Sequence, residues 1–205
     1  ADQQLSKAEK DVTKELEDYR KSLLKYRYEQ LYVNERLDTT VTDEMVDEYY
    51  EAHADKFVLQ RPIVRARYLN ILADSPVLKQ LRKMMKSSEP NDLVEADSLA
   101  YSSALKFMTW NNDWVDAALL AGEFGTDYNS MLASMSGGWI EQKDTTGYLK
   151  LAYIPEMIGR GRQAPVDYCA PMIKDMIISA RKQALISGLE RDLLNDAREN
   201  GKFII

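Results

Sequence analysis

Apolar side chains recur every three or four residues at both ends of the chain, which is the spacing of an amphipathic helix. Near the N-terminus these positions are Leu5, Ala8, Val12, Leu16, Tyr19, Leu23 and Tyr26. Near the C-terminus they are Ile173, Met176, Ile177, Ala180, Ala184, Leu185, Leu189 and Leu193. The pattern predicts two long helices, and because neither can bury its apolar face alone, we expect them to pack together as one lobe.

The segment between them changes period several times. Thr42 suits a helix N-cap, with Asp43 and Glu44 in the first turn, so a short helix is predicted up to about Phe57. The further predicted elements are a strand over 64–72, helices over 77–85 and 93–104 with a loop over 87–92, short helical patches within 107–136, a hairpin with strands over 139–142 and 148–154, and a short strand over 203–205.

This order predicts an α+β fold in which a helical lobe from both chain ends carries an inserted α/β unit. The expected domain limits are 1–60 for the N-terminal helices, 62–155 for the inserted unit, and 156–205 for the C-terminal helix that completes the lobe. The 205 residues are enough for one large or two small domains with hydrophobic cores.

Composition removes several classes of function. The net charge is −6 and Lys and Arg do not cluster, so we expect no nucleic-acid binding. No apolar run is long enough for a transmembrane segment. Cys169 is the single cysteine, which excludes an intrachain disulfide and a cysteine-rich zinc site, and we predict no metal or cofactor. His53 is the single histidine, and its neighbours Glu51 and Asp55 predict a solvated helix face.

Three passages resemble the SurA-type periplasmic chaperones and their parvulin-type (PpiC-type) peptidyl-prolyl isomerase relatives. Residues 41–50, continuing to Phe57, resemble the end of the family's N-terminal helical lobe. Residues 64–71 resemble the first parvulin strand, and the stretch from Gly138 through 147–151 resembles the closing hairpin. The helix around 181–185 resembles the family's return helix.

The resemblance implies a parvulin-like unit without its catalytic pair. Active parvulins carry one histidine in the first strand and another in the last, and these positions fall at Tyr68 and Leu149 in this chain. We therefore predict a degenerate domain with no catalytic residues. The alternative is an active prolyl isomerase with a rearranged site.

The predicted function is that of a chaperone for unfolded or membrane-protein client polypeptides. Tyrosine and methionine suit contact with varied peptides, because one is rigid and amphipathic and the other adaptable. The candidate peptide-binding residues are Tyr26, Tyr49, Tyr50, Met172 and Met176. Packing within the lobe is the competing interpretation for each residue, and a structural subunit that docks a fixed partner is a second alternative for the protein. The resemblance implies a periplasmic location and is compatible with a lipoprotein anchored through an upstream cysteine.

Overall fold

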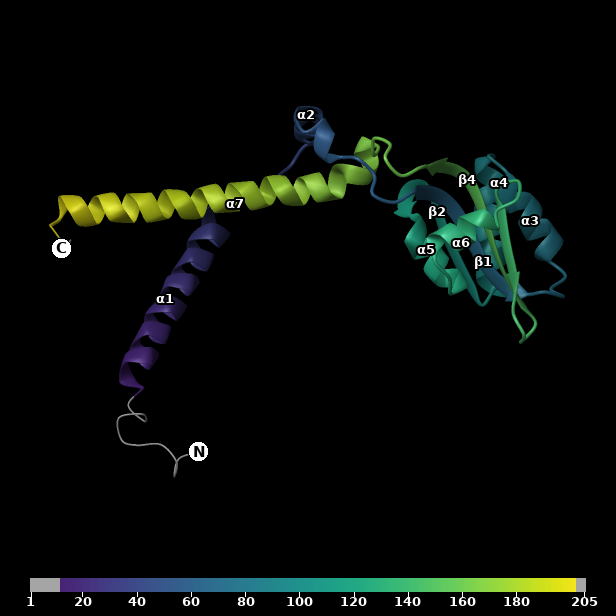
Figure 1. The fold of residues 1–205 in the computed structure, drawn as a ribbon, viewed down its shortest axis with the longest axis horizontal. Helices are drawn as coiled ribbons and strands as arrows, with labels where there is room; N and C mark the ends of the chain where they lie inside the picture. The colour runs from purple at the N-terminus through teal and green to yellow at the C-terminus, as the bar shows by residue number, and fades with distance from the viewer. Residues whose placement is uncertain (1–11, 202–205) are drawn as a thin grey trace, which may run out of the picture. The chain divides into compact units, whose positions relative to one another are not determined.

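The structure is a computed structural model that describes residues 12–201; the predicted strand over 203–205 and the helix positions Leu5 and Ala8 lie outside the described residues (Figure 1). The described part has an α+β fold with seven α-helices and a four-stranded antiparallel sheet. The elements are α1 (Thr13–Arg36), α2 (Asp43–Ala52), β1 (Ile63–Leu72), α3 (Leu78–Lys86), α4 (Pro90–Ser103), β2 (Lys106–Asp116), α5 (Ala117–Phe124), α6 (Tyr128–Ala133), β3 (Trp139–Lys143), β4 (Tyr148–Ile158) and α7 (Val166–Glu199), with a 3-10 turn at Ala54–Lys56.

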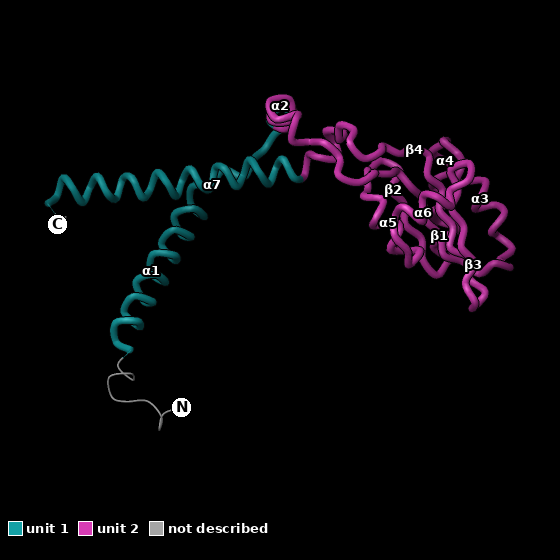
Figure 2. Tube along the Cα trace, in the orientation of Figure 1, with its two compact units in different colours: residues 1–45, 172–205 teal, residues 46–171 magenta. Residues whose placement is uncertain are grey.

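The chain consists of two compact units (Figure 2). Unit 1 comprises residues 1–45 and 172–205, so both ends of the chain contribute to it, and unit 2 comprises residues 46–171. The domain limits expected from the sequence, 1–60, 62–155 and 156–205, stay a prediction.

Unit 2 is built on a sheet with the strand order β2-β1-β4-β3, in which every neighbouring pair is antiparallel. Helices cover both faces. Against one face lie α5 and α6, where the core includes Ala66, Tyr68 and Leu120. Against the other lie α3 and α4, where the core includes Leu69 and Leu81. Side chains along β1 alternate between the two cores, as a central strand requires.

The strand β2 corrects the expectation of short helical patches within 107–136, since helices occupy only the later part of that segment. Phe107 packs on the α3/α4 side, whereas Met108 and Trp110 pack on the α5/α6 side. Because both faces of the sheet are covered, apolar residues occur consecutively along β2 and the alternation that marks a half-buried strand is lost. After it, the Asp116 side chain accepts a hydrogen bond from Ala118 N–H and caps α5.

Several element limits also differ from those expected. The strand β4 continues to Ile158 rather than 154, because Pro155 falls where the β1–β4 register shifts and no regular ladder bond is needed. The helix α4 begins at Pro90, since proline suits the first turn of a helix. The cap at Thr42 is confirmed by a hydrogen bond of 3.3 Å from Met45 N–H to Thr42 Oγ1.

In unit 1, the N-terminal and C-terminal helices contact each other, as predicted. Val33 is the buried residue of the described part of α1, and Lys25 donates a 2.9 Å hydrogen bond to Glu190 of α7. Figure 1 shows α1 meeting α7 near the C-terminal end of α1 and diverging from it towards Thr13. Most of the described residues of α1 are exposed.

Candidate functional site

The first candidate site is the exposed apolar surface of α1. Leu16 is 61% exposed and Tyr19 is 67% exposed, although both belong to the helix's apolar seam. The exposed large apolar side chains of this helix are Leu16, Tyr19, Leu23, Leu24, Tyr26, Tyr28 and Leu31. We call these seven residues the α1 surface. At about 100° per residue, Leu16, Tyr19, Leu23 and Tyr26 lie along one side of the helix, and Leu24, Tyr28 and Leu31 lie along another. Exposed apolar side chains in this number are typical of an interaction site.

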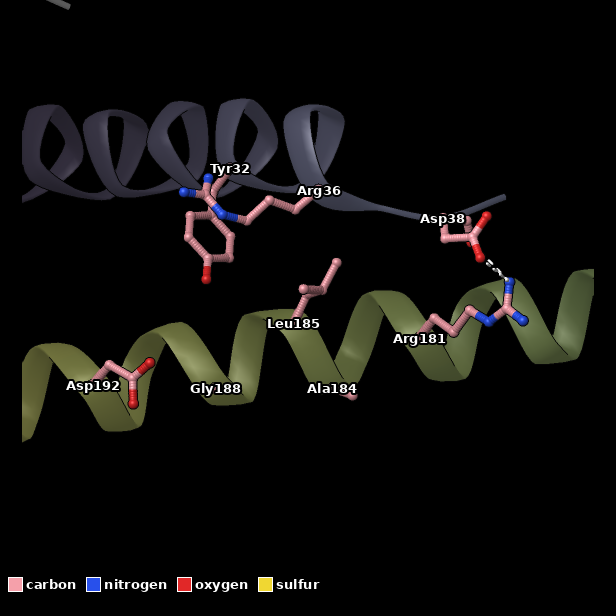
Figure 3. A pocket seen from close by; sticks show the side chains of 8 residues that line it. All are labelled: Tyr32, Arg36, Asp38, Arg181, Ala184, Leu185, Gly188 and Asp192. Carbon is pink, nitrogen blue, oxygen red and sulfur yellow. Dashed lines mark hydrogen bonds and ion pairs between the residues drawn. The ribbon is translucent and has the colours of Figure 1, made fainter. Parts of the chain in front are cut away.

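A groove lies beside this surface, between the C-terminal part of α1 and the middle of α7 (Figure 3). Its volume is about 390 Å³. Tyr32 and Leu185 point into it from opposite helices, and the Arg36 guanidinium stacks on the Tyr32 ring at 4.3 Å. Gly188 leaves space on the α7 side, since an added Cβ there would meet nothing within 4 Å. The groove can accept an apolar side chain.

Arg181 fixes one end of the groove. Its Nη1 atom donates hydrogen bonds to the Asp38 carbonyl oxygen at 2.9 Å and to the Thr40 carbonyl oxygen at 2.7 Å. These two carbonyls lie in the segment that follows α1, where they have left the helical hydrogen-bond pattern. Lys174 adds an ion pair with Asp43 at 3.1 Å. The guanidinium thereby ties the end of α1 to α7 and defines the groove's shape.

The predicted peptide-binding residues of unit 1 do not form one patch. Tyr26, Met172 and Met176 are all exposed. The Lys25–Glu190 contact places Tyr26 near position 190 of α7. At 1.5 Å of helix rise per residue, Met176 lies about 21 Å further along α7 and Met172 about 27 Å. A single short peptide segment would not contact all three side chains.

The predicted residues Tyr49 and Tyr50 belong to unit 2, where both are half-buried. The Tyr50 ring stacks on Phe57 at 5.3 Å, and its hydroxyl donates to the Ala164 carbonyl oxygen at 2.5 Å. Tyr49 stacks on His53 at 4.3 Å. The expectation that His53 lies on a solvated face is thus only partly met, because the residue is half-buried and its imidazole stacks on an aromatic ring. These contacts give both tyrosines a packing role.

Tyr68, the first degenerate parvulin position, is fully buried. Its ring packs edge-on against Phe124 at 5.5 Å, and its hydroxyl donates to the Glu123 carbonyl oxygen at 3.4 Å. Lys150 Nζ donates to the same oxygen at 2.8 Å. Burial, with the nearby Glu123 charge, raises the pKa of Tyr68 to about 12. Tyr68 and Lys150 thus both satisfy the carbonyl oxygen of Glu123 near the C-terminal end of α5.

The second degenerate position, Leu149, lies on the other face of the sheet. Register pairs Tyr68 with Ala152 and Ile71 with Leu149, and antiparallel partners share a face. Ile71 belongs to the α3/α4 core, whereas Tyr68 belongs to the α5/α6 core. The side chains of Tyr68 and Leu149 therefore face opposite sides of the sheet and do not converge on one site; their assignment as the two degenerate parvulin positions stays a prediction. Ala152 is the residue directly opposite Tyr68.

Other reactive groups are few in the described residues. Burial raises the pKa of the Cys169 thiol, which favours an unreactive protonated side chain. Between residues 12 and 201, no group of three or more His, Cys, Asp or Glu side chains is placed to hold a metal ion. Likewise, none of the helices that the structure describes is both long and apolar enough to cross a membrane.

No protein-family model and no curated protein matches this chain. Two solved structures are similar to it, both from work on the virulence factor PEB4 and the periplasmic protein Cj1289, SurA-like chaperones of Campylobacter jejuni. One is 19% identical with a TM-score of 0.35, covering 92% of this chain and 75% of that one. The other is 15% identical with a TM-score of 0.34, covering 87% of this chain and 60% of that one. The chain thus has a weak structural resemblance to SurA-like chaperones.

Sequence reasoning did not find the groove. Tyr32 stood among many tyrosines, and Gly188 carried no turn or break signal inside a long helical pattern. An unexplained glycine in the apolar stretch 184–189 is the signal that could have found it, because glycine in a helix interior costs about 1 kcal/mol relative to alanine. Such a residue draws attention to this part of α7, although an added Cβ at Gly188 would meet no atom within 4 Å.

Proposed function

We propose that this chain is a chaperone-like protein that binds unfolded polypeptide segments on the α1 surface and the adjacent groove, without prolyl isomerase activity. One observation carries the proposal: α1 exposes seven large apolar side chains and buries Val33 alone among its described residues. An ordinary surface helix would turn such side chains into a core. A helix that leaves them in water is suited to bind apolar segments of other chains.

The surface favours weak, unselective binding. Tyr19, Tyr26 and Tyr28 each present a rigid ring with a polar tip, which suits varied partners. Burying one such side chain contributes roughly 1.5–3 kcal/mol before the cost of ordering the client. A few simultaneous contacts give an affinity on the order of micromolar, or about −8 kcal/mol. Because the attraction is mainly apolar, binding should resist added salt.

The packing around Tyr68 supports the proposed lack of prolyl isomerase activity. A prolyl isomerase must bind a twisted amide and lower a barrier of roughly 20 kcal/mol with polar groups in an accessible pocket. Here Tyr68 and Lys150 both bond the Glu123 carbonyl oxygen. In a proline-limited refolding assay, we expect the chain to leave the slow phase unchanged. An accelerated slow phase that disappears in Tyr68→Ala would favour a rearranged isomerase site.

Suppression of aggregation tests the binding function. An unfolded β-barrel membrane protein is diluted from denaturant with wild-type chain or with the Leu23→Ala/Tyr26→Ala variant. We expect wild type to suppress light scattering at a several-fold molar excess and the variant to lose most of this effect. Val94→Ala, an exposed apolar residue of α4, is the matched control and should act as wild type. If wild type suppresses nothing, the chaperone proposal fails and docking of a fixed partner takes its place.

We also propose an extracytoplasmic setting, on the resemblance of residues 41–50, 64–71 and 147–151 to the SurA-type family. Fractionation of cells that express the protein from its native gene tests it. Recovery with periplasmic or membrane-anchored proteins is expected, and recovery with cytoplasmic proteins would contradict it.

A further inference from the structure

The β2 strand has one edge without a strand neighbour, since it ends the order β2-β1-β4-β3. Hydrogen bonds elsewhere in the sheet fix which residues face that edge. Asp144 N–H donates to the Tyr148 carbonyl oxygen, and Ile154 N–H donates to the Gly138 carbonyl oxygen. Even-numbered β4 residues therefore direct their backbone groups towards β3, and odd-numbered residues direct theirs towards β1.

The same alternation carries across β1 to β2. Odd-numbered β1 residues face β4, so even-numbered ones face β2, which agrees with the hydrogen bond from Leu105 N–H to the Asn70 carbonyl oxygen. Tyr68 pairs with Met108, and Ala66 pairs with Trp110. The intervening Phe107 and Thr109 thus direct their N–H and C=O groups outward. Among residues 12–201, no partner for these outward groups is observed.

A pocket of about 420 Å³ lies directly beside this edge. Phe107 and Thr109 line it from β2, and Ala100 and Tyr101 line it from α4. The Tyr101 side chain is 91% exposed, although the residue sits next to the α3/α4 core. Backbone groups without a partner and an apolar pocket are thus presented together, on one side of the sheet.

We propose that the β2 edge at 106–110 and its pocket bind an extended polypeptide segment by strand addition. The segment's amide and carbonyl groups pair with those of Phe107 and Thr109, and one of its apolar side chains enters the pocket beside Tyr101. Main-chain pairing supplies affinity without sequence selection, and the pocket favours a large side chain at one alternate position. The occupant is therefore an extended segment in which apolar and polar residues alternate.

The opposite edge of the sheet shows why β2 is the binding edge. β3 is short, at five residues, and its outward-facing Glu141 is held by two hydrogen bonds from Arg82, at 2.5 and 2.9 Å. Short length and fixed charge are the features that protect an edge strand from pairing. The outward residue Thr109 of β2 carries neither charge nor a bulky side chain.

This inference rests on the proposed function, because it names a second surface for the same class of client. The probe is a fluorescent peptide of about seven residues in which valine and tyrosine alternate with threonine and lysine, long enough to span the regular part of β2. The test variant is Thr109→Pro, which removes an outward N–H and leaves the β1 ladder intact, as proline is tolerated on edge strands. Lys143→Pro is the matched control, since Lys143 faces outward on β3.

We expect Thr109→Pro to weaken peptide binding by about tenfold or more, the loss of roughly 1.4 kcal/mol, and Lys143→Pro to leave it unchanged. Two peptides with N-methyl groups on alternate amides, one on the odd and one on the even positions, provide the same test with unaltered protein. Only the peptide whose methyl groups replace the N–H groups that face β2 should lose binding. Equal binding by wild type and Thr109→Pro, or by both N-methylated peptides, would overturn the inference. So would a concentration-dependent dimer of wild type that Thr109→Pro abolishes, because the occupant would then be a second copy.

The two proposals fail in distinguishable ways. Leu23→Ala/Tyr26→Ala should keep peptide binding at β2 while it loses suppression of aggregation. If Thr109→Pro keeps both activities, the strand-addition site is wrong and the α1 surface stands. If wild type binds neither client nor peptide, both proposals are wrong.

Discussion

The two units differ in where their large apolar side chains lie. In unit 2, the central strand β1 has covered faces, and Tyr68 and Leu69 on successive positions are buried in separate cores. In unit 1, Leu16 and Tyr19 lie on a helix of the same chain and remain exposed. The described helices of unit 2 cover both faces of its sheet, whereas most described residues of α1 are exposed, so the two regions differ in how far other elements cover their apolar side chains.

The comparison indicates a division between stability and binding. Side chains that are buried on folding contribute to stability, and their removal leaves a cavity. Side chains that stay in water contribute little to stability and are available to a partner. Substitutions in the two units should therefore have opposite profiles: loss of stability in unit 2, and loss of binding with retained stability in unit 1.

The largest expected effect is that of Tyr68→Ala. The change removes a buried ring that contacts Phe124 and a hydroxyl that bonds the Glu123 carbonyl oxygen. We expect unit 2 to lose about 3–5 kcal/mol of unfolding free energy in urea denaturation, the usual range for a buried aromatic residue. Leu16→Ala in unit 1 is the comparison variant and should change stability by about 0.5 kcal/mol or less. Similar losses for both variants would remove the distinction between the units.

A smaller loss is expected from Arg67→Met. Arg67 is the buried charged residue of β1, and its guanidinium donates to Asn111 Oδ1 and to the Met85 and Ser87 carbonyl oxygens at the end of α3. Methionine keeps most of the volume but leaves these acceptors without a donor, so about 2–3 kcal/mol should be lost. Thermal unfolding monitored by circular dichroism measures it. An unchanged or raised midpoint would show that these hydrogen bonds contribute nothing net.

The smallest effect in this series is a loss of stability in alkali. Burial first, and the Glu123 charge second, raise the pKa of Tyr68 from 10.0 to about 12. The folded state therefore holds this proton more tightly, so the contribution is fully present below pH 10 and is lost as pH rises towards 12. Urea midpoints of wild type should fall across this window relative to Tyr68→Phe, which has no such proton. Parallel pH profiles for the two proteins would contradict a buried phenol.

The sequence predicted those elements whose pattern depends on local geometry. The spacing of Leu16, Tyr19, Leu23 and Tyr26 gave the long N-terminal helix, and Thr42 gave the start of the next one. The contact between terminal helices followed from their apolar faces. The sequence did not predict that most of the α1 face stays exposed, because periodicity identifies an apolar face but not the element that covers it.

The features that the sequence did not predict depend on tertiary structure. β2 has apolar residues at Phe107, Met108 and Trp110 because its two sides face different cores, and this pattern alone cannot separate a strand from a helix. That Tyr68 and Leu149 face opposite sides of the sheet could be known only from the register of β1 on β4, because a shift of one residue changes the face of every side chain. Tyr50 was predicted to bind peptides because tyrosine suits such contacts. Its hydroxyl instead donates a hydrogen bond to the carbonyl oxygen of Ala164, a residue far away in the sequence.

The most direct test of the central claim is site-specific crosslinking to a client. A photoreactive amino acid replaces Leu23 on the α1 surface or Val94 on α4, both exposed apolar positions. The protein is irradiated with an unfolded β-barrel client, and the crosslinked product is measured on a denaturing gel. The proposed function predicts a strong client crosslink from position 23 that resists added salt, and little from position 94. Equal crosslinking from both positions, or none from position 23, would contradict it.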